Sequence, residues 1–115
     1  MDYPKRGEIH IVNLDPTIGA EIKKTRPVVV ISNDINNKFS ATITVLPVTD
    51  KGKRTYPFEV NLPVEQTGLK KESKVKCQQI RTVDKRRLVK IFGTVGLDIL
   101  QKIEQGLMIH LGIEV

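Results

Sequence analysis

The chain has 115 residues, enough for one modest hydrophobic core, and we predict that residues 1–115 form a single domain. Nineteen Lys and Arg against thirteen Asp and Glu give a net charge of +6, which favours a polyanionic partner such as RNA or DNA. Cys77 is the only cysteine, so an intrachain disulfide is excluded. The N-terminus lacks the apolar stretch of a signal peptide, and no segment approaches the ~20 apolar residues of a membrane helix, so we predict a cytoplasmic protein.

The first half of the chain predicts strands separated by polar loops. Residues 8–14 alternate between apolar and polar types, which indicates a strand, and residues 15–25 form a long charged loop of the kind that often carries function. The β-branched run over 28–32 predicts a strand buried on both faces, with Pro27 at its start. A polar loop is expected over 33–40, followed by a strand over 41–49 that pairs with the previous one as a hairpin.

The second half predicts three more strands and one helix. A basic loop over 50–54 precedes a strand over 56–62, a turn region over 68–73, and strands over 75–83 and 88–95. From Gly96 the apolar period changes to three or four residues, which predicts an amphipathic helix, although Gly106 inside it costs up to ~1 kcal/mol relative to Ala. Short strands followed by one helix predict a small, strongly bent antiparallel β-barrel.

Several kinds of catalytic site are absent from the sequence. The glycines are scattered, so no phosphate-binding loop is formed, and no GxSxG motif is present. His10 and His110 lie a hundred residues apart, and with one Cys they do not make a zinc site. A surface or structural role is favoured for each histidine, and we expect neither a metal nor a cofactor.

Arg26 and Thr49 are the residues that the predicted hairpin brings together. Arg26 precedes one strand and Thr49 ends the next, so both fall on one rim beside the 15–25 loop. A guanidinium beside a hydroxyl is suited to holding a phosphate. The ordinary alternative is an Arg26 paired with Glu21 and a Thr49 chosen for β-propensity, and spacing alone favours that alternative.

The chain resembles the MazF/PemK/Kid family of toxins. The similar segments occur in the family's order and span nearly the whole chain: Lys5–Ile9, Asn13–Pro16, Gly19–Glu21, Arg26–Ser32, Tyr56–Val60 and Cys77–Leu88. The resemblance implies an SH3-like barrel of the CcdB/MazF type and a homodimer. It also implies an endoribonuclease that cuts single-stranded mRNA at short specific sequences, and a MazE-like antitoxin that masks the site.

The resemblance also implies which residues act. The family's catalytic Arg before Pro matches Arg26, and its catalytic Thr at the end of the third strand matches Thr49. One branch instead uses a His in the first loop and an Arg-Cys-Asp stretch in the fifth strand, where this chain has Ala20 and Lys76–Gln78, so it looks like the branch built on Arg and Thr. The proton-transfer groups therefore stay open, and Glu21 is the nearest plausible base by sequence.

Metal-free RNA cleavage uses the 2′-hydroxyl as the nucleophile on the adjacent phosphorus, and the fork of Arg26 suits stabilisation of the phosphorane. The hydroxyl of Thr49 is suited to holding a non-bridging oxygen. Four loop cations that flank the rim are expected to position phosphates, unless half of them only confer solubility: Lys23, Lys24, Lys53 and Arg54. Base readout is expected from Gln78, Gln79 and loop backbone.

Two other classes of function stay open. An SH3-like barrel could bind RNA without cutting it, and toxins of the same fold, such as the CcdB type, act on a protein target. The pairing of Arg26 with Thr49 argues against both, because neither needs a phosphate grip there. Any contact with DNA is expected only through the antitoxin complex.

Overall fold

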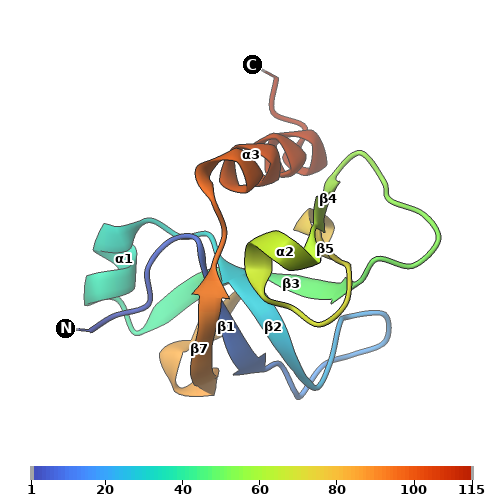
Figure 1. The fold of residues 1–115 in the computed structure, drawn as a ribbon. Coiled ribbons are helices and arrows are strands. Elements are labelled where there is room, and N and C mark those ends of the chain that lie inside the picture. The colour runs from blue at the N-terminus through green and yellow to red at the C-terminus, as the bar shows by residue number, and fades with distance from the viewer. Residues whose placement is uncertain (1, 115) are drawn as a thin grey trace.

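The computed structural model describes residues 2–114, without the side chain of Gln66. Figure 1 shows strands and helices in this order: β1 (Glu8–Asn13), β2 (Thr25–Val30), α1 (Asp34–Phe39), β3 (Thr42–Asp50), β4 (Glu59–Leu62), α2 (Val64–Thr67), β5 (Ser73–Lys76), β6 (Arg81–Asp84), β7 (Leu88–Thr94) and α3 (Leu97–Leu111). Two short 3₁₀ turns, η1 (Cys77–Gln79) and η2 (Lys85–Arg87), flank β6.

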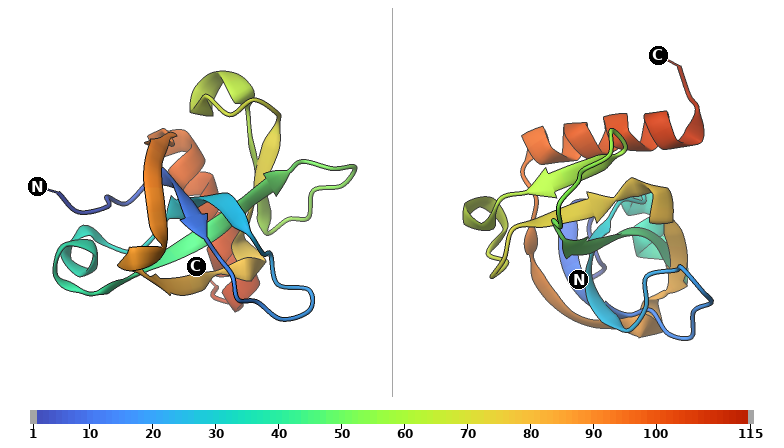
Figure 2. Two further views of the ribbon diagram at one scale, coloured as in Figure 1. Left: turned by 90° about the horizontal axis from the view of Figure 1, so that it is seen from below. Right: turned by 90° about the vertical axis from the view of Figure 1, so that its right-hand side faces the viewer.

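The strands form one antiparallel sheet in the order β4-β5-β3-β2-β1-β7, and β6 pairs with β3 beside this path. The nine-residue β3 is the central strand, because it pairs with β2, β5 and β6. The sheet curls into an open barrel, and α3 lies across one side of it (Figure 2). The prediction of a mainly antiparallel β fold with a C-terminal helix is confirmed. No helix within residues 2–114 is both long and apolar enough to cross a membrane.

The strand β2 is buried on both faces, as its β-branched run predicts. Val28 and Val30 belong to the cluster inside the barrel, whereas Val29 and Ile31 belong to the cluster that includes Ile103 of α3. Successive side chains of a strand point to opposite faces, so one strand supplies both clusters. One core cluster therefore lies on each side of β2.

Three sequence predictions are wrong. The polar loop expected over 33–40 contains α1, whose N-terminus is capped by the Asn33 side chain accepting the backbone N–H of Asn36 at 2.8 Å. The single strand expected over 75–83 is broken by η1. Val48 of β3 pairs with Val75, whereas Val45 pairs with Arg81, so three extra residues must leave the ladder between β5 and β6. The strand expected over 56–62 begins only at Glu59.

The glycine inside α3 has a packing role. A Cβ added at Gly106 would lie 2.9 Å from Cys77 Sγ and 3.2 Å from the carbonyl oxygen of Phe58. Only a glycine lets α3 approach η1 this closely. The helix is unbroken across Gly106, and the glycine lets it contact Cys77 of η1 and Phe58 closely.

Candidate active site

Arg26 and Thr49 lie on one face of the sheet, in neighbouring strands. The ladder between β2 and β3 ends at Val28 and Pro47, and its antiparallel register, extended by two residues, would set Arg26 opposite Thr49. Cross-strand partners point to the same face. On its other side Thr49 pairs with Lys74 of β5. Arg26, Thr49 and Lys74 thus form a polar row across three neighbouring strands. This register agrees with the rim that the hairpin predicts, and the joint action of Arg26 and Thr49 stays a prediction.

Both side chains are half-buried, and neither forms an ion pair in the described part of the chain. Arg26 donates from Nε to the carbonyl oxygen of Lys23 at 3.1 Å, a contact that directs the guanidinium along the end of the β1–β2 loop. Within residues 2–114, no ion pair joins Arg26 to Glu21, so the structural Arg26–Glu21 pair considered from the sequence does not form in this structure. The outer nitrogens of its fork are available for a phosphate.

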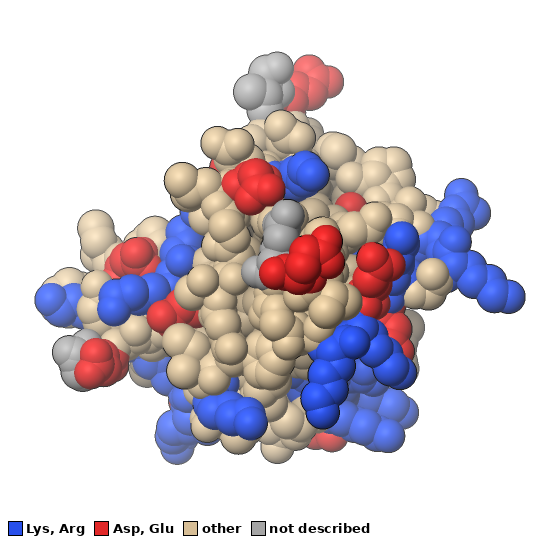
Figure 3. Space-filling model, viewed as in Figure 1, with Lys and Arg blue, Asp and Glu red and all other residues tan. Residues whose placement is uncertain are grey.

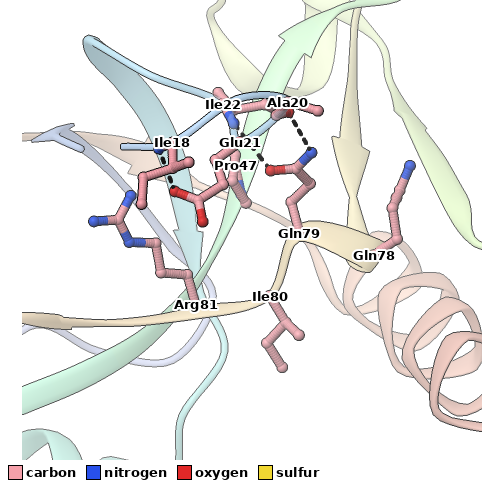
Figure 4. Close-up of a pocket in the computed structure, with 9 residues that line it drawn as sticks. All are labelled: Ile18, Ala20, Glu21, Ile22, Pro47, Gln78, Gln79, Ile80 and Arg81. Carbon is pink, nitrogen blue, oxygen red and sulfur yellow. Dashed lines mark hydrogen bonds between the residues drawn. The ribbon is translucent and has the colours of Figure 1, made fainter. Parts of the chain in front are cut away.

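The β1–β2 loop (residues 14–24) is held in place by the side chains of Gln79 and Arg87. Gln79 accepts the backbone N–H of Ile22 at 3.0 Å and donates to the carbonyl oxygen of Ala20 at 3.2 Å (Figure 4). Arg87 donates to the carbonyl oxygens of Asn13 and Asp15 at the loop's start. The amide of Gln79 is therefore committed to the loop here, and its part in base readout stays a prediction.

Glu21 lies in this loop and is exposed. Its carboxylate accepts the backbone N–H of Ile18 at 2.9 Å, and its own N–H donates to the carbonyl oxygen of Ile18 at 3.1 Å. These bonds close the turn over Ile18 to Glu21. They leave one carboxylate oxygen without a bond to the described chain, and the role of Glu21 as a base stays a prediction.

A cavity of about 560 Å³ lies beneath the loop (Figure 4). It is lined by Ile18, Ala20, Glu21 and Ile22 of the loop, by Pro47 of β3, and by the segment Gln78–Arg81. Pro47, which lines the cavity, precedes Thr49 by two residues in β3, so the two side chains point to the same face of the strand. The sequence did not single out Arg81, which enters this cavity because η1 sets the position of β6.

The β3–β4 loop (residues 51–58) carries Lys53 and Arg54, and a buried carboxylate anchors it. Glu59, whose side chain is 1% exposed, accepts from Lys74 Nζ at 2.9 Å and from the N–H of Tyr56 at 3.1 Å. Lys74 also donates to the carbonyl oxygen of Arg54 at 2.8 Å. Lys74, the cross-strand neighbour of Thr49, thus ties the loop to the polar row.

The same carboxylate orients Gln78, because its second oxygen accepts from Gln78 Nε2 at 2.7 Å. Burial raises the pKa of Glu59, but hydrogen bonds from Lys74, Gln78 and the Tyr56 N–H outweigh it and hold the pKa below its ordinary value. Glu59 is therefore ionised at neutral pH and can only accept, so the amide nitrogen of Gln78 must face it.

The predicted phosphate-binding cations lie on the two loops. Lys23, Lys24, Lys53 and Arg54 are all exposed. Both loops project to the same side of the molecule in Figure 1, and Figure 3 shows Lys and Arg side chains gathered there. Arg54 lies over the ring of Tyr56 at 4.6 Å, and Tyr56 stacks on Phe58 with ring centroids 5.6 Å apart. The rim is thus basic, with aromatic rings on one of its loops.

The histidines and the cysteine lie away from the rim and contact other residues of the fold. His10 is buried and lies 2.9 Å from Glu8 Oε1, and His110 is tilted against Phe58. Burial raises the pKa of the Cys77 thiol to about 11, so it stays protonated and is a poor nucleophile. Among residues 2–114, no three His, Cys, Asp or Glu side chains gather as metal ligands would.

Comparison with known proteins identifies relatives of the whole chain. Residues 5–111 match the family described as PemK-like, MazF-like toxin of type II toxin–antitoxin system. Endoribonuclease MazF9 of Mycobacterium tuberculosis is 39% identical over 93% of this chain and 95% of its own length. Endoribonuclease EndoA of Bacillus subtilis is 34% identical over 95% of each chain. The crystal structure of MazF from Deinococcus radiodurans is similar with a TM-score of 0.85 and 28% identity, over 97% of this chain and 99% of that one.

Proposed function

The chain belongs to the family of PemK-like and MazF-like toxins of type II toxin–antitoxin systems, and on this premise we propose that it cuts single-stranded mRNA at short specific sequences without a metal ion. Its activity is that of an endoribonuclease toxin, like the relatives it matches over most of its length. The observation that supports the proposal is the register of β2 and β3, which, extended by two residues, sets Arg26 opposite Thr49 beside a basic rim.

The reaction that fits this rim is transesterification within the RNA. The 2′-oxygen forms a bond to the adjacent phosphorus, the bond from phosphorus to the 5′-oxygen breaks, and a 2′,3′-cyclic phosphate and a 5′-hydroxyl result. Arg26 stabilises the added negative charge of the phosphorane, because its planar fork matches two oxygens. Thr49 donates a hydrogen bond to a non-bridging oxygen.

Two proton transfers complete the reaction. The proton of the 2′-hydroxyl must leave as the oxygen attacks, and Glu21 is the carboxylate nearest by sequence to Arg26 on the loop beside the rim. Arg26 is a poor base because its pKa exceeds ~12. A second group must supply a proton to the departing 5′-oxygen. We assign the first transfer to Glu21 and leave the second unassigned.

Incubation with mixed single-stranded RNA in EDTA tests this function. We expect short fragments with 2′,3′-cyclic phosphate ends, formed at full rate without added metal. Cleavage that stops in EDTA and returns with Mg²⁺ or Zn²⁺ would contradict the mechanism. Tight binding with intact RNA would support a binding module instead, and the absence of both would support action on a protein target.

We also propose that the chain forms a homodimer. Large apolar side chains remain exposed on β7 and at the two ends of α3: Ile91, Phe92, Leu97, Ile109 and Leu111. Exposed apolar surface of this kind is typical of protein interfaces. Analytical ultracentrifugation at micromolar concentration should show a dimer, and a monomer alone would contradict the proposal.

An antitoxin of the MazE type is proposed as the protein partner in the cytoplasm. The family consists of the toxins of type II toxin–antitoxin systems, in which each toxin is paired with an antitoxin. The net charge of +6 and the clustered loop cations favour an acidic inhibitor segment across the rim. Protection of Arg26 and of the Lys23–Lys24 backbone from chemical or isotopic exchange in the inhibited complex is expected. Unchanged exposure of both would rule out masking of the rim.

A further inference from the structure

Two buried side-chain polar atoms have no hydrogen-bond partner within the described chain: Gln78 Oε1 and Arg81 Nη1. Both residues line the cavity beneath the β1–β2 loop. Buried polar atoms almost always have a partner, so an unpartnered arginine nitrogen at a cavity is a place where a water molecule or a ligand binds. Figure 4 shows Gln78 directed away from the loop, whereas the Arg81 side chain runs from β6 toward the turn at Ile18 and Glu21.

The guanidinium of Arg81 has the donors needed for such a ligand. No side chain or carbonyl of residues 2–114 hydrogen-bonds to it, and no ion pair neutralises it. Glu21 lines the same cavity with the opposite charge, yet its bonded oxygen is turned to the N–H of Ile18. A half-buried, unpaired arginine is costly in the absence of a partner. Its fork of donors is therefore available to the cavity.

The walls of the cavity combine polar groups with apolar side chains, which suits a flat ligand that has both apolar faces and a polar edge. Ile18, Ile22, Pro47 and Ile80 line it beside the guanidinium. Ile18 is 82% exposed, so an apolar side chain stands open where a ligand would cover it. A phosphate would leave these surfaces wet, whereas an unstacked nucleobase would bury them and keep one polar edge for Arg81. In the proposed function, Arg26 and Thr49 at the rim bind the phosphate.

We propose that this cavity receives one unstacked base of the RNA and that Arg81 reads its edge, with guanine as the preferred base. The proposal rests on the proposed function, since it concerns the same RNA. Guanine presents two adjacent acceptors, O6 and N7, that match two N–H groups of one guanidinium, and this is the commonest specific contact of arginine with a base. Adenine places an amino donor where guanine has O6. The fixed guanidinium would therefore oppose its own donors to that group.

The first test is the pattern of cut sites. Wild-type protein is incubated with a pool of random-sequence single-stranded RNA, and the fragment ends are sequenced. We expect one position near the cut to be guanine in nearly all sites. Efficient cleavage at sites with no fixed guanine would overturn this inference and leave the endoribonuclease intact, whereas a pool left wholly uncut would overturn the proposed function together with the inference that rests on it.

The second test removes single atoms from the contact. In an RNA that wild-type protein cuts, 7-deazaguanine at the fixed position deletes the N7 acceptor and keeps base pairing and shape. Cleavage should slow, and adenine at that position should cost roughly 10- to 100-fold, the discrimination of one good bidentate contact. Undiminished cleavage of both RNAs would contradict the assignment of the cavity. This test needs no protein variant, so it does not depend on the folding of a mutant.

Protein variants then connect the preference to Arg81. Arg81→Met and Arg81→Lys should cut guanine, 7-deazaguanine and adenine RNAs at nearly equal rates, because neither has the fork. Arg86→Met removes the same charge from an exposed arginine that pairs with Asp84, and it should keep the wild-type preference. Circular dichroism checks that each variant is folded. A folded Arg81→Lys that keeps the full guanine preference would overturn the role of Arg81.

Discussion

Lys74 Nζ lies 2.9 Å from Glu59 Oε1, with the two side chains 11% and 1% exposed, and Lys74 is the cross-strand partner of Thr49. The pair also binds the backbone of the β3–β4 loop and the amide of Gln78. One buried ion pair therefore fixes three elements of the proposed RNA-binding surface. Its energetics follow from burial, because Lys74 would have no counter-ion without Glu59, and Glu59 would keep only Lys76, 3.9 Å away, without Lys74.

Breaking this pair from one side should be strongly destabilising. Lys74→Met or Glu59→Leu should each lower the free energy of unfolding by about 3–5 kcal/mol, because the remaining charge stays buried. The double variant should recover much of the loss. Urea unfolding measures this. Lys51→Met, which breaks an exposed pair with Glu72 at 3.9 Å, is the matched control and should change the free energy by less than about 1 kcal/mol.

Stability should fall in acid because of Glu59. Its pKa is lowered in the folded protein relative to its ordinary value of 4.5, so the folded state binds this proton less readily than the unfolded state. The contribution is complete above pH 4.5 and is lost as the pH falls through the lowered value. Urea midpoints between pH 7 and pH 3 should decline less steeply for Glu59→Gln than for wild type. Equal slopes would show that Glu59 does not carry the effect.

Gly106→Ala should destabilise the chain even though alanine is the better helix former. The added Cβ would meet Cys77 Sγ at 2.9 Å, and overpacking of this kind typically costs about 1–3 kcal/mol. Thermal unfolding is the measurement. Gln101→Ala, on the exposed face of α3, should keep the wild-type midpoint within a few degrees. A more stable Gly106→Ala protein would mean that α3 does not lie this close to η1.

Glu21→Gln separates a proton-transfer role from a structural one. Glutamine keeps an oxygen that can accept the N–H of Ile18, so the turn should survive. It cannot take a proton from the 2′-hydroxyl, so single-turnover cleavage should fall by ~10²–10⁴. A rate close to that of wild type would limit Glu21 to closing the turn.

The sequence predicted those features that depend on local patterns and on one hairpin. The β-branched run over 28–32 indicates burial on both faces, and Val28 and Val29 do belong to different clusters. The same hairpin predicted that Arg26 and Thr49 share a rim. Both inferences need only the alternation of a strand and its nearest neighbour in the chain.

The break at η1 could not be read from the sequence, because it is set by pairing with a distant strand. Alternation over 75–83 places Cys77, Gln79 and Arg81 on one face, yet they have three different surroundings. Cys77 is in the core, Gln79 holds the β1–β2 loop, and Arg81 lines the cavity. The ladders of β5 and β6 on β3 are offset by three residues, and local periodicity carries no trace of that offset.

The central claim is that Arg26 and Thr49 hold the reacting phosphate, and single-turnover cleavage of one RNA by three variants tests it most directly. Arg26→Ala should lose ~10²–10³ in rate, and Arg26→Lys should recover little, because a point charge lacks the fork. Thr49→Val keeps the β-branched shape without the hydroxyl, so it should fold normally and cut slowly. Thermal midpoints within a few degrees of wild type would show that all three variants are folded. Slow cleavage by folded variants is the predicted result, and a near-normal rate for Arg26→Ala would contradict the site.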